Sequence, residues 1–363
     1  MEDNSNHLLT NQEANRSFFT FFSEFRTSDQ IVTVTIESVV LGTVFLISML
    51  ANVCMIVLVV KGKKLANFQC FVLNLFLADI VFVGVTPVII TVRWTESWTL
   101  GPHVCHILFY IMATSGCVTI ITLAAISVER FTAILSLRLR SPLHFKWVTA
   151  VVLTIWLFSA VTSLPLCLYF QMMTVQVKGQ EYQICTLVWP NTLQEIIWDV
   201  VYSLVDFAVP GFIIVISYTK ILKITKGARR RLQANRPCPA HQQMVRVSKQ
   251  DYWLFRTLLV LMLSFFIMWT PIFLIIFLIL AQNFKRDLFL SSTWFFWVCA
   301  FTLANSAVNP ILYGATQSKS NWQYLLHFFH LFRFKNRGNL ATEHTLRKVR
   351  TPDQQTPPSV IYD

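Results

Sequence analysis

The chain has 363 residues, of which 55% are hydrophobic and only 13% charged, and it includes 31 Phe and 11 Trp. A soluble core of this length does not need so much apolar material, so the composition indicates a membrane protein. The formal net charge of +12 would also suit a nucleic-acid-binding protein. The sequence has neither a stretch in which aromatic and basic residues alternate nor the spacing of zinc ligands, so this alternative is disfavoured.

Residues 1–35 are polar and contain no apolar core of a signal peptide, so we expect them to remain on the protein as an extracellular segment. They carry one N-glycosylation sequon, Asn15-Arg16-Ser17. A short sequon also arises by chance, but this one agrees with the orientation derived below.

Seven apolar stretches have the roughly 20 residues that a spanning helix needs. They cover residues 36–61, 69–93, 103–130, 147–171, 195–222, 255–282 and 292–315. We therefore predict an all-α membrane fold with a seven-transmembrane helix bundle over residues 36–316.

Lys and Arg set the orientation of this bundle. They gather in the links after the first, third and fifth stretches and after the seventh, for example at Lys63, Arg138, Arg230 and Arg347. The other links are poorer in them. The N-terminus is thus predicted to lie outside the cell and the C-terminus inside.

Three segments outside the spans have patterns of their own. The outer loop at 172–194 alternates apolar and polar residues around Lys178-Gly179, which predicts a β-hairpin. The amphipathic pattern of residues 317–335 predicts a helix, helix eight, that lies on the inner leaflet of the membrane. Residues 336–363 have the composition of a disordered cytoplasmic tail.

Polar residues within the predicted spans are functional candidates, because they are costly in hydrocarbon. Asp79, Asn305 and Asn309, with Asn52, could hold a sodium ion with water. A plain interhelical hydrogen-bond network is the alternative.

At the inner helix ends, Arg130 lies beside Glu129, and Asp251 follows the basic inner loop. An arginine between two carboxylates could latch the third and sixth helices together. Two ordinary interfacial ion pairs are the alternative.

Several motifs occur in a fixed order: Asn52, LNLFLAD, Cys105 with Cys185, Glu-Arg-Phe, Trp156, Pro210 with Tyr218, MWTP and NPILY. This set resembles the rhodopsin-like G-protein-coupled receptors over about residues 36–332. The resemblance implies a disulfide between Cys105 and Cys185, the two cysteines in predicted outer links. It also implies a set of activation switches: Asp79, Ile120, Glu129, Arg130, Pro210, Tyr218, Asp251, Phe265, Asn309, Pro310 and Tyr313. Glu129 and Met268 depart mildly from the family pattern.

The ligand class follows from what the outer halves of the helices offer. The position where amine receptors of this family carry a carboxylate holds Met112, and the seventh stretch contains no lysine for retinal. The expected pocket is apolar and aromatic: Phe82, Trp98, Phe109, Met112, Trp198, Tyr202, Trp269, Ile272, Phe273, Phe295, Phe296 and Thr302.

Arg93 is the clearest cation at the outer end of the predicted bundle. It could reach lipid headgroups, or it could pair with a carboxylate in a bidentate way. Stretches such as VRWTESW and ICTLVWP resemble the receptors for long-chain free fatty acids. That resemblance implies an acid head at Arg93, signalling through Gq-type and perhaps-secondary Gi-type G proteins, arrestin recruitment and a plasma-membrane location with internalisation to endosomes. Asp206, where a neutral amide is expected, departs from it.

In the cytoplasmic tail we predict phosphorylation sites that recruit arrestin, at Thr342, Thr345, Thr351, Thr356 and Ser359. A receptor for another lipid or a peptide remains an alternative within the same fold. A transporter is disfavoured by the lack of internal repeats, and an enzyme by the lack of a nucleophile–base pair. We predict no cofactor, and give little weight to metal at His103 and His106.

Overall fold

The computed structural model describes residues 18–24, 31–61, 67–136, 145–177, 179–233, 249–282 and 290–316. These residues contain seven helical segments that are long and apolar enough to cross a membrane, and each overlaps one predicted stretch. Met1–Leu312 form one compact unit and Tyr313–Asp363 a second, of which only residues 313–316 are described.

Several of the seven segments consist of more than one helix. In chain order the elements are α2 (Ile31–Val60), α3 (Asn67–Val83), α4 (Thr86–Thr95), α5 (Gly101–Ser136), α6 (Phe145–Tyr169), β1 (Phe170–Val177), β2 (Gln180–Leu187), α7 (Thr192–Ser203), the π-helix η1 (Leu204–Ala208), α8 (Val209–Gln233), α9 (Lys249–Gln282), α10 (Ser292–Leu303) and α11 (Asn305–Thr316). Thus α3–α4, α7–η1–α8 and α10–α11 each form one membrane segment.

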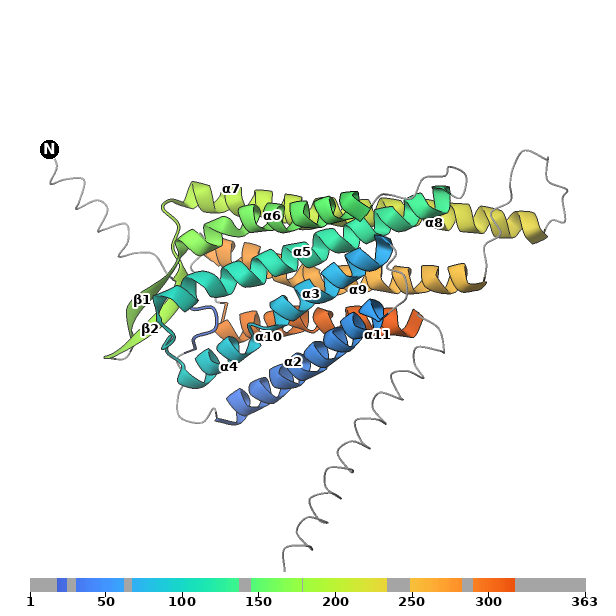
Figure 1. The fold of residues 1–363 in the computed structure, drawn as a ribbon. Helices are drawn as coiled ribbons and strands as arrows, with labels where there is room; N and C mark the ends of the chain where they lie inside the picture. The colour runs from blue at the N-terminus through green and yellow to red at the C-terminus, as the bar shows by residue number, and fades with distance from the viewer. Residues whose placement is uncertain are drawn as a thin grey trace, which may run out of the picture. The chain divides into compact units, whose positions relative to one another are not determined.

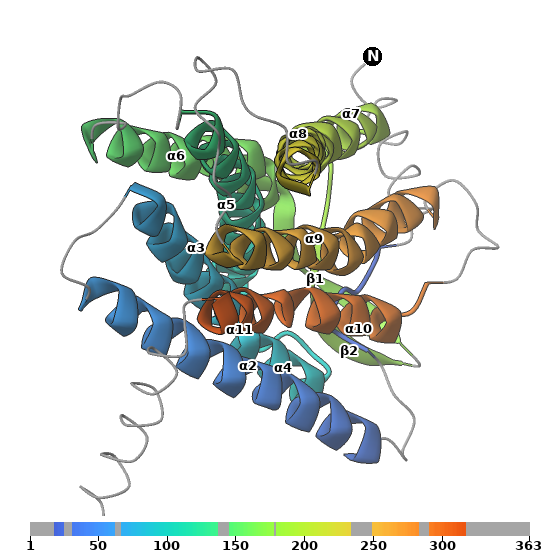
Figure 2. The same ribbon diagram turned by 90° about the vertical axis from the view of Figure 1, so that its right-hand side faces the viewer.

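The helix α5 lies inside the bundle, where it packs against α3, α6 and α8 (Figures 1 and 2). Its side chains are accordingly among the most buried, including Val118 and Ile120. The helix α6 instead points large apolar side chains outward, and Leu157 is 68% exposed. Such a surface is unfavourable in water but matches the hydrocarbon of a membrane.

Pro310 lies inside the helix α11. Pro310 has no backbone N–H, which leaves the carbonyl of Ser306 without its usual helical partner. The side chain of Asn52 on α2 donates a 2.8 Å hydrogen bond to that carbonyl. The proline kink is therefore stabilised by a polar side chain from a neighbouring helix, as hydrocarbon surroundings demand.

The predicted hairpin is confirmed. The strands β1 and β2 pair antiparallel from Phe170 opposite Leu187 to Val177 opposite Gln180. The turn includes Gly179 with φ of +82°, a conformation that glycine adopts without steric cost.

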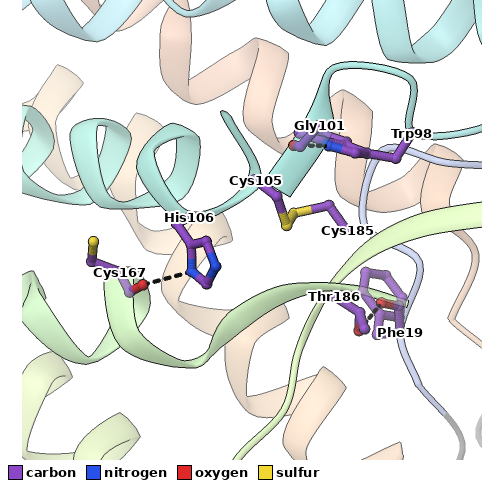
Figure 3. The surroundings of a disulfide bond; sticks show 8 residues. All are labelled: Phe19, Trp98, Gly101, Cys105, His106, Cys167, Cys185 and Thr186. Atoms are coloured by element: carbon purple, nitrogen blue, oxygen red, sulfur yellow. Dashed lines mark hydrogen bonds between the residues drawn. A yellow bond between two sulfur atoms is a disulfide. The ribbon is translucent and has the colours of Figure 1, made fainter. Parts of the chain in front are cut away.

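The predicted disulfide is also confirmed, and Figure 3 shows Cys105 of α5 joined to Cys185 of β2. Beside it, His106 donates from Nδ1 to the carbonyl of Cys167, 2.9 Å away. The hairpin is thus fixed to the start of α5 and lies at the outer end of the bundle (Figure 1).

Some predictions fall outside the described residues. These are helix eight at 317–335, the tail at 336–363 with its five phosphorylation sites, and the sequon at Asn15.

Candidate ligand-binding site

A chamber of about 970 Å³, counting space open to solvent, lies between the outer halves of the helices. Most of its wall is apolar. It is lined by Phe21, Phe82, Phe109, Met112, Ala113, Gly116, Cys117, Ile120, Leu166, Phe170, Leu187, Glu195, Trp198, Asp199, Tyr202, Trp269, Ile272, Phe273, Ile276, Ile279, Leu280, Phe295, Cys299 and Thr302. A chamber with such an apolar wall suits a small ligand with a long apolar part.

The structure places most of the predicted pocket residues on this wall. Ten of the twelve line the chamber: Phe82, Phe109, Met112, Trp198, Tyr202, Trp269, Ile272, Phe273, Phe295 and Thr302. Trp98 and Phe296 do not. Trp98 is buried and donates from its indole N–H to the carbonyl of Gly101 at 2.8 Å, as Figure 3 shows. Trp98 therefore holds the start of α5 rather than the chamber wall.

Gly116 of α5 and Trp269 of α9 face each other on the wall of the chamber. A Cβ atom built at this position would lie 3.0 Å from the ring of Trp269, closer than packed carbon atoms allow. The Trp269 ring also stacks on Phe82, with 5.4 Å between ring centroids. Glycine on α5 thus gives the Trp269 ring the space that it occupies in the chamber wall.

Residues 18–24, which we call the N-terminal roof, supply a part of the site that the sequence did not predict. Phe21 lines the chamber and contacts Phe109 and Phe295 edge-on at 5.0 and 5.2 Å. Its neighbour Phe22 stacks on Phe109 at 5.5 Å. The roof is therefore an aromatic lid that packs onto side chains of α5 and α10.

Hydrogen bonds fix the roof to three elements. Thr186 of β2 donates to the carbonyl of Phe19 at 2.8 Å, as Figure 3 shows. Ser292 of α10 donates to the carbonyl of Ser23 at 2.8 Å. Arg93 of α4 donates to the carbonyl of Phe22 at 3.1 Å. These bonds hold the aromatic residues of the roof in place over the chamber.

Arg93 lies at the centre of a buried ionic cluster. It is 2% exposed, so it does not reach lipid headgroups. Its Nε and Nη2 donate to the two carboxylate oxygens of Glu37 on α2 at 2.8 and 2.7 Å. Nη2 also pairs with Glu24 of the roof at 2.9 Å. The guanidinium lies over the ring of Phe296, 5.0 Å from its centroid.

The position of Arg93 relative to the chamber matters for its predicted role. Arg93 does not line the chamber, but it donates to the carbonyl of Phe22, whose ring packs against the lining residue Phe295. Glu37 is fully buried, whereas the side chain of Glu24 is 26% exposed. Of the two carboxylates that Arg93 holds, Glu24 is therefore the one that can be replaced more easily.

Two carboxylates on α7 were also not anticipated as pocket residues. Glu195 and Asp199 line the chamber and are 7% and 4% exposed. Among the described lining residues there is no Lys, Arg or His. The signal that could have revealed them is their spacing: Glu195, Trp198, Asp199 and Tyr202 share one helical face.

Asp206, also on the same membrane segment, lies deeper. It is buried in η1 and accepts a hydrogen bond from Thr162 at 3.3 Å. It does not line the chamber. A buried acid thus faces α6 rather than the apolar part of a ligand.

The predicted polar network inside the bundle is partly assembled. Asn309 donates to Asp79 at 2.8 Å, and Thr119 donates to it at 3.3 Å. The side chain of Asn305 is buried, and neither its oxygen nor its nitrogen has a hydrogen-bond partner among the described residues. Asn305 therefore has the capacity to bind a water or ion, and the sodium site stays a prediction.

At the inner end of α5, Arg130 donates from Nε to Glu129 at 2.7 Å and lies over the ring of Phe68. Asp251 belongs to α9, but its side chain is outside the described part, so the proposed latch to Asp251 stays a prediction. The other predicted switches Ile120, Phe265 and Tyr218 are buried in the bundle. Tyr313 belongs to α11.

Comparison with known proteins decides the family. The model of the 7 transmembrane receptor (rhodopsin family) matches residues 51–313. The chain belongs to the rhodopsin family of seven-transmembrane receptors. It is therefore a receptor rather than an enzyme, a multi-pass protein of the plasma membrane, and a member of a class that couples to G proteins.

Individual relatives narrow the comparison. The chain is 48% identical to free fatty acid receptor 4 of Rattus norvegicus, over 93% of this chain and 94% of the relative. It is 47% identical to the receptor of the same name from Mus musculus over the same shares. Galanin receptor type 1 of Rattus norvegicus is more distant, at 29% identity over 77% of this chain and 78% of the relative.

Proposed function

We propose that this receptor is activated by medium- to long-chain free fatty acids, especially polyunsaturated ones. The observation that carries the proposal is the aromatic, apolar chamber, which resembles an acyl chain in polarity. The printed name of the relatives that are 48% and 47% identical supports the same ligand class. Each buried methylene contributes about 0.8 kcal/mol, so a long chain gains affinity steadily with length.

The two carboxylates of α7 constrain how the acid lies in the chamber. A fatty-acid carboxylate near Glu195 and Asp199 would meet like charges in an apolar wall, which is unfavourable. The acid head is therefore directed away from α7 and toward the roof. Arg93 lies behind that roof, and it already binds carboxylates in the bidentate manner that a guanidinium prefers.

We infer that the ligand carboxylate takes the place of Glu24 on Nη2 of Arg93, while Glu37 keeps its own two hydrogen bonds. Glu24 would then compete with the ligand from within the receptor. Because Glu24 is about a quarter exposed, its pair with Arg93 is screened more by solvent than the fully buried pair with Glu37. Replacing it by another carboxylate costs little, and the apolar chain supplies the affinity.

The test compares a free acid with its methyl ester at equal surface expression. In Glu24→Gln, loss of the competing charge should raise the potency of the acid by up to about fivefold, from a pair of about 0.2–1 kcal/mol. The potency of the ester should not change. If acid and ester shift together, Glu24 only positions the roof.

A second pair of receptors tests Arg93 itself. The double variant Arg93→Gln/Glu37→Gln removes the guanidinium without leaving a buried carboxylate behind. The acid should lose about 10- to 150-fold in potency, from a charge-assisted bond of about 1.5–3 kcal/mol. Arg93→Lys should keep part of the response, because an ammonium cannot form the planar fork. An ester that loses as much as the acid would contradict the carboxylate site.

Signal output is proposed to proceed through Gq-type G proteins, with Gi-type proteins as a second route, and through arrestin. Calcium mobilisation in transfected cells, screened over fatty acids, amines and peptides, tests the ligand class and the Gq route together. Truncation after Phe334 removes all five predicted phosphorylation sites. The truncated receptor should keep the calcium signal but lose most arrestin recruitment and the subsequent delivery to endosomes. Normal arrestin recruitment by the truncated receptor would exclude the tail as the segment that recruits arrestin.

The inner latch is tested by Asp251→Asn. If Arg130 holds Asp251 in the resting state, the variant should raise basal signalling at matched surface expression. Unchanged basal signalling would exclude the latch to Asp251 and leave Arg130 with its contacts to Glu129 and Phe68.

A further inference from the structure

The chamber carries a feature that a fatty acid does not use. On α7, Glu195, Trp198, Asp199 and Tyr202 follow one another at intervals of three, one and three residues, so they share a single helical face. All four line the chamber. An otherwise apolar chamber thus has one negatively charged wall, and its described lining offers no cation to neutralise it.

Glu195 has an ordinary structural explanation. It lies in the first turn of α7, whose N-cap Asn191 accepts a hydrogen bond from the backbone of Gln194 at 2.8 Å. A carboxylate in a first turn interacts favourably with the helix dipole. Glu195 by itself therefore does not indicate a ligand.

Asp199 has no such explanation. It lies two turns into α7, and only 4% of its surface is exposed. Within the described ranges its side chain makes no hydrogen bond and no ion pair, and its one electrostatic neighbour is the like-charged Glu195. A buried carboxylate without a partner is costly, so it marks a position where a partner is missing.

The neighbouring aromatic rings suit a cation as that partner. Trp198 stacks on Tyr202 with 4.6 Å between centroids. The indole N–H of Trp198 donates to the carbonyl of Thr162 at 3.2 Å, which fixes the ring. Aromatic rings attract ammonium groups, and here Trp198 and Tyr202 lie on the same helical face as the two carboxyl groups.

We propose that this face of α7 is a second binding site within the chamber, specific for an aliphatic amine: a protonated amino group at Asp199 and Glu195, with its hydrocarbon chain among the apolar residues of the wall. A cation between the two carboxylates would relieve their mutual repulsion as well as pair with each. The site differs from that of amine receptors with a carboxylate on the third helix, since α5 has Met112 in the chamber. The proposal goes beyond the fatty-acid function and does not rest on it.

The site predicts competition between two ligand classes of opposite charge. Both place a hydrocarbon chain in the same chamber, whereas their heads lie at different walls: the amine at α7 and the acid toward Arg93. An amine should therefore reduce fatty-acid binding without contacting Arg93.

The experiment uses the full-length receptor in lipid nanodiscs at pH 7, with dodecylamine and dodecan-1-ol as matched probes. They share the chain and differ in charge. Stabilisation against heat is measured over a ligand titration for native receptor and for Asp199→Asn, Asp199→Glu and Glu195→Gln. Glu181→Gln, which changes an exposed carboxylate on β2, controls for surface charge.

Dodecylamine should stabilise the native receptor and Glu181→Gln at concentrations where dodecan-1-ol does not. Asp199→Asn should weaken amine binding about 10- to 150-fold, as expected for loss of a bond to a charged group. Asp199→Glu should keep most of it, because the charge remains. If Asp199→Asn fails to fold, Glu195→Gln, which should also weaken binding, decides in its place.

Equal stabilisation by amine and alcohol, or equal amine affinity in native receptor and Asp199→Asn, would overturn the proposal. The fatty-acid response of the native receptor is measured separately in cells. Failure of the amine site with an intact fatty-acid response removes only this inference, and loss of the fatty-acid response with intact amine binding removes only the proposed function.

Discussion

Replacing Arg93 should destabilise the receptor before any ligand is added. In Arg93→Gln, the fully buried carboxylate of Glu37 loses its two hydrogen bonds at 2.7 and 2.8 Å. Removing one partner of a buried ion pair lowers the free energy of unfolding by about 3–5 kcal/mol, because the remaining charge stays buried away from water. The roof also loses the bond from Arg93 to the carbonyl of Phe22.

The double variant Arg93→Gln/Glu37→Gln separates this cost from the loss of a ligand contact. Neutralising both partners removes the buried charge, so most of the 3–5 kcal/mol should be recovered. We expect the unfolding temperatures of the purified, ligand-free receptors to decrease from native to double variant to Arg93→Gln. Lys61→Gln removes an exposed charge and should change stability by no more than about 0.5 kcal/mol.

Intrinsic tryptophan fluorescence during heating in one detergent gives the comparison. If Arg93→Gln and the double variant unfold at the same temperature, Glu37 carries no buried charge and the reasoning is refuted. The result also governs how functional data are read: a silent Arg93→Gln receptor reports on folding unless the double variant is silent too.

Three further outcomes follow from the structure. Gly116→Ala should displace the Trp269 ring and cost about 1–3 kcal/mol by overpacking, with a changed ligand potency as the readout. Loss of the disulfide in Cys105→Ser/Cys185→Ser should lower stability by about 2–5 kcal/mol, since the bond closes a sequence separation of 80 residues; thermal unfolding under non-reducing conditions checks it. Replacing Asp79 by Asn should abolish any difference in agonist affinity between sodium and a large organic cation, and a difference that survives would place the sodium effect elsewhere.

The sequence predicted the fold well, because each of its main features depends on local pattern. Apolar runs mark the seven spans without knowledge of their neighbours. The hairpin follows from alternation around Lys178-Gly179, and the disulfide from the two cysteines placed in outer links and the family resemblance. Most of the predicted pocket residues line the chamber for a similar reason, since large apolar side chains on the outer helix halves have few other places to point.

What the sequence could not reveal depends on contacts between distant segments. Phe21 and Phe295 are far apart in the chain, and no periodic pattern connects them. The sequence could not identify the partner of Arg93 for the same reason, because Glu37 reaches the guanidinium only through the packing of α2 beside α4. Asp199 was not predicted, because the acids considered within apolar runs were Asp79 on α3 and Asp206 on η1, and none on α7.

The roof changes what counts as the binding domain of this receptor. Phe21 forms part of the chamber wall although it precedes the first spanning helix. An expression strategy that trims the N-terminus back to α2, or fuses a partner protein there, would therefore produce a receptor with all seven helices and an altered ligand site. Ligand affinities measured on such shortened receptors would describe an open chamber, and comparisons among relatives based on the helices alone would omit the same surface.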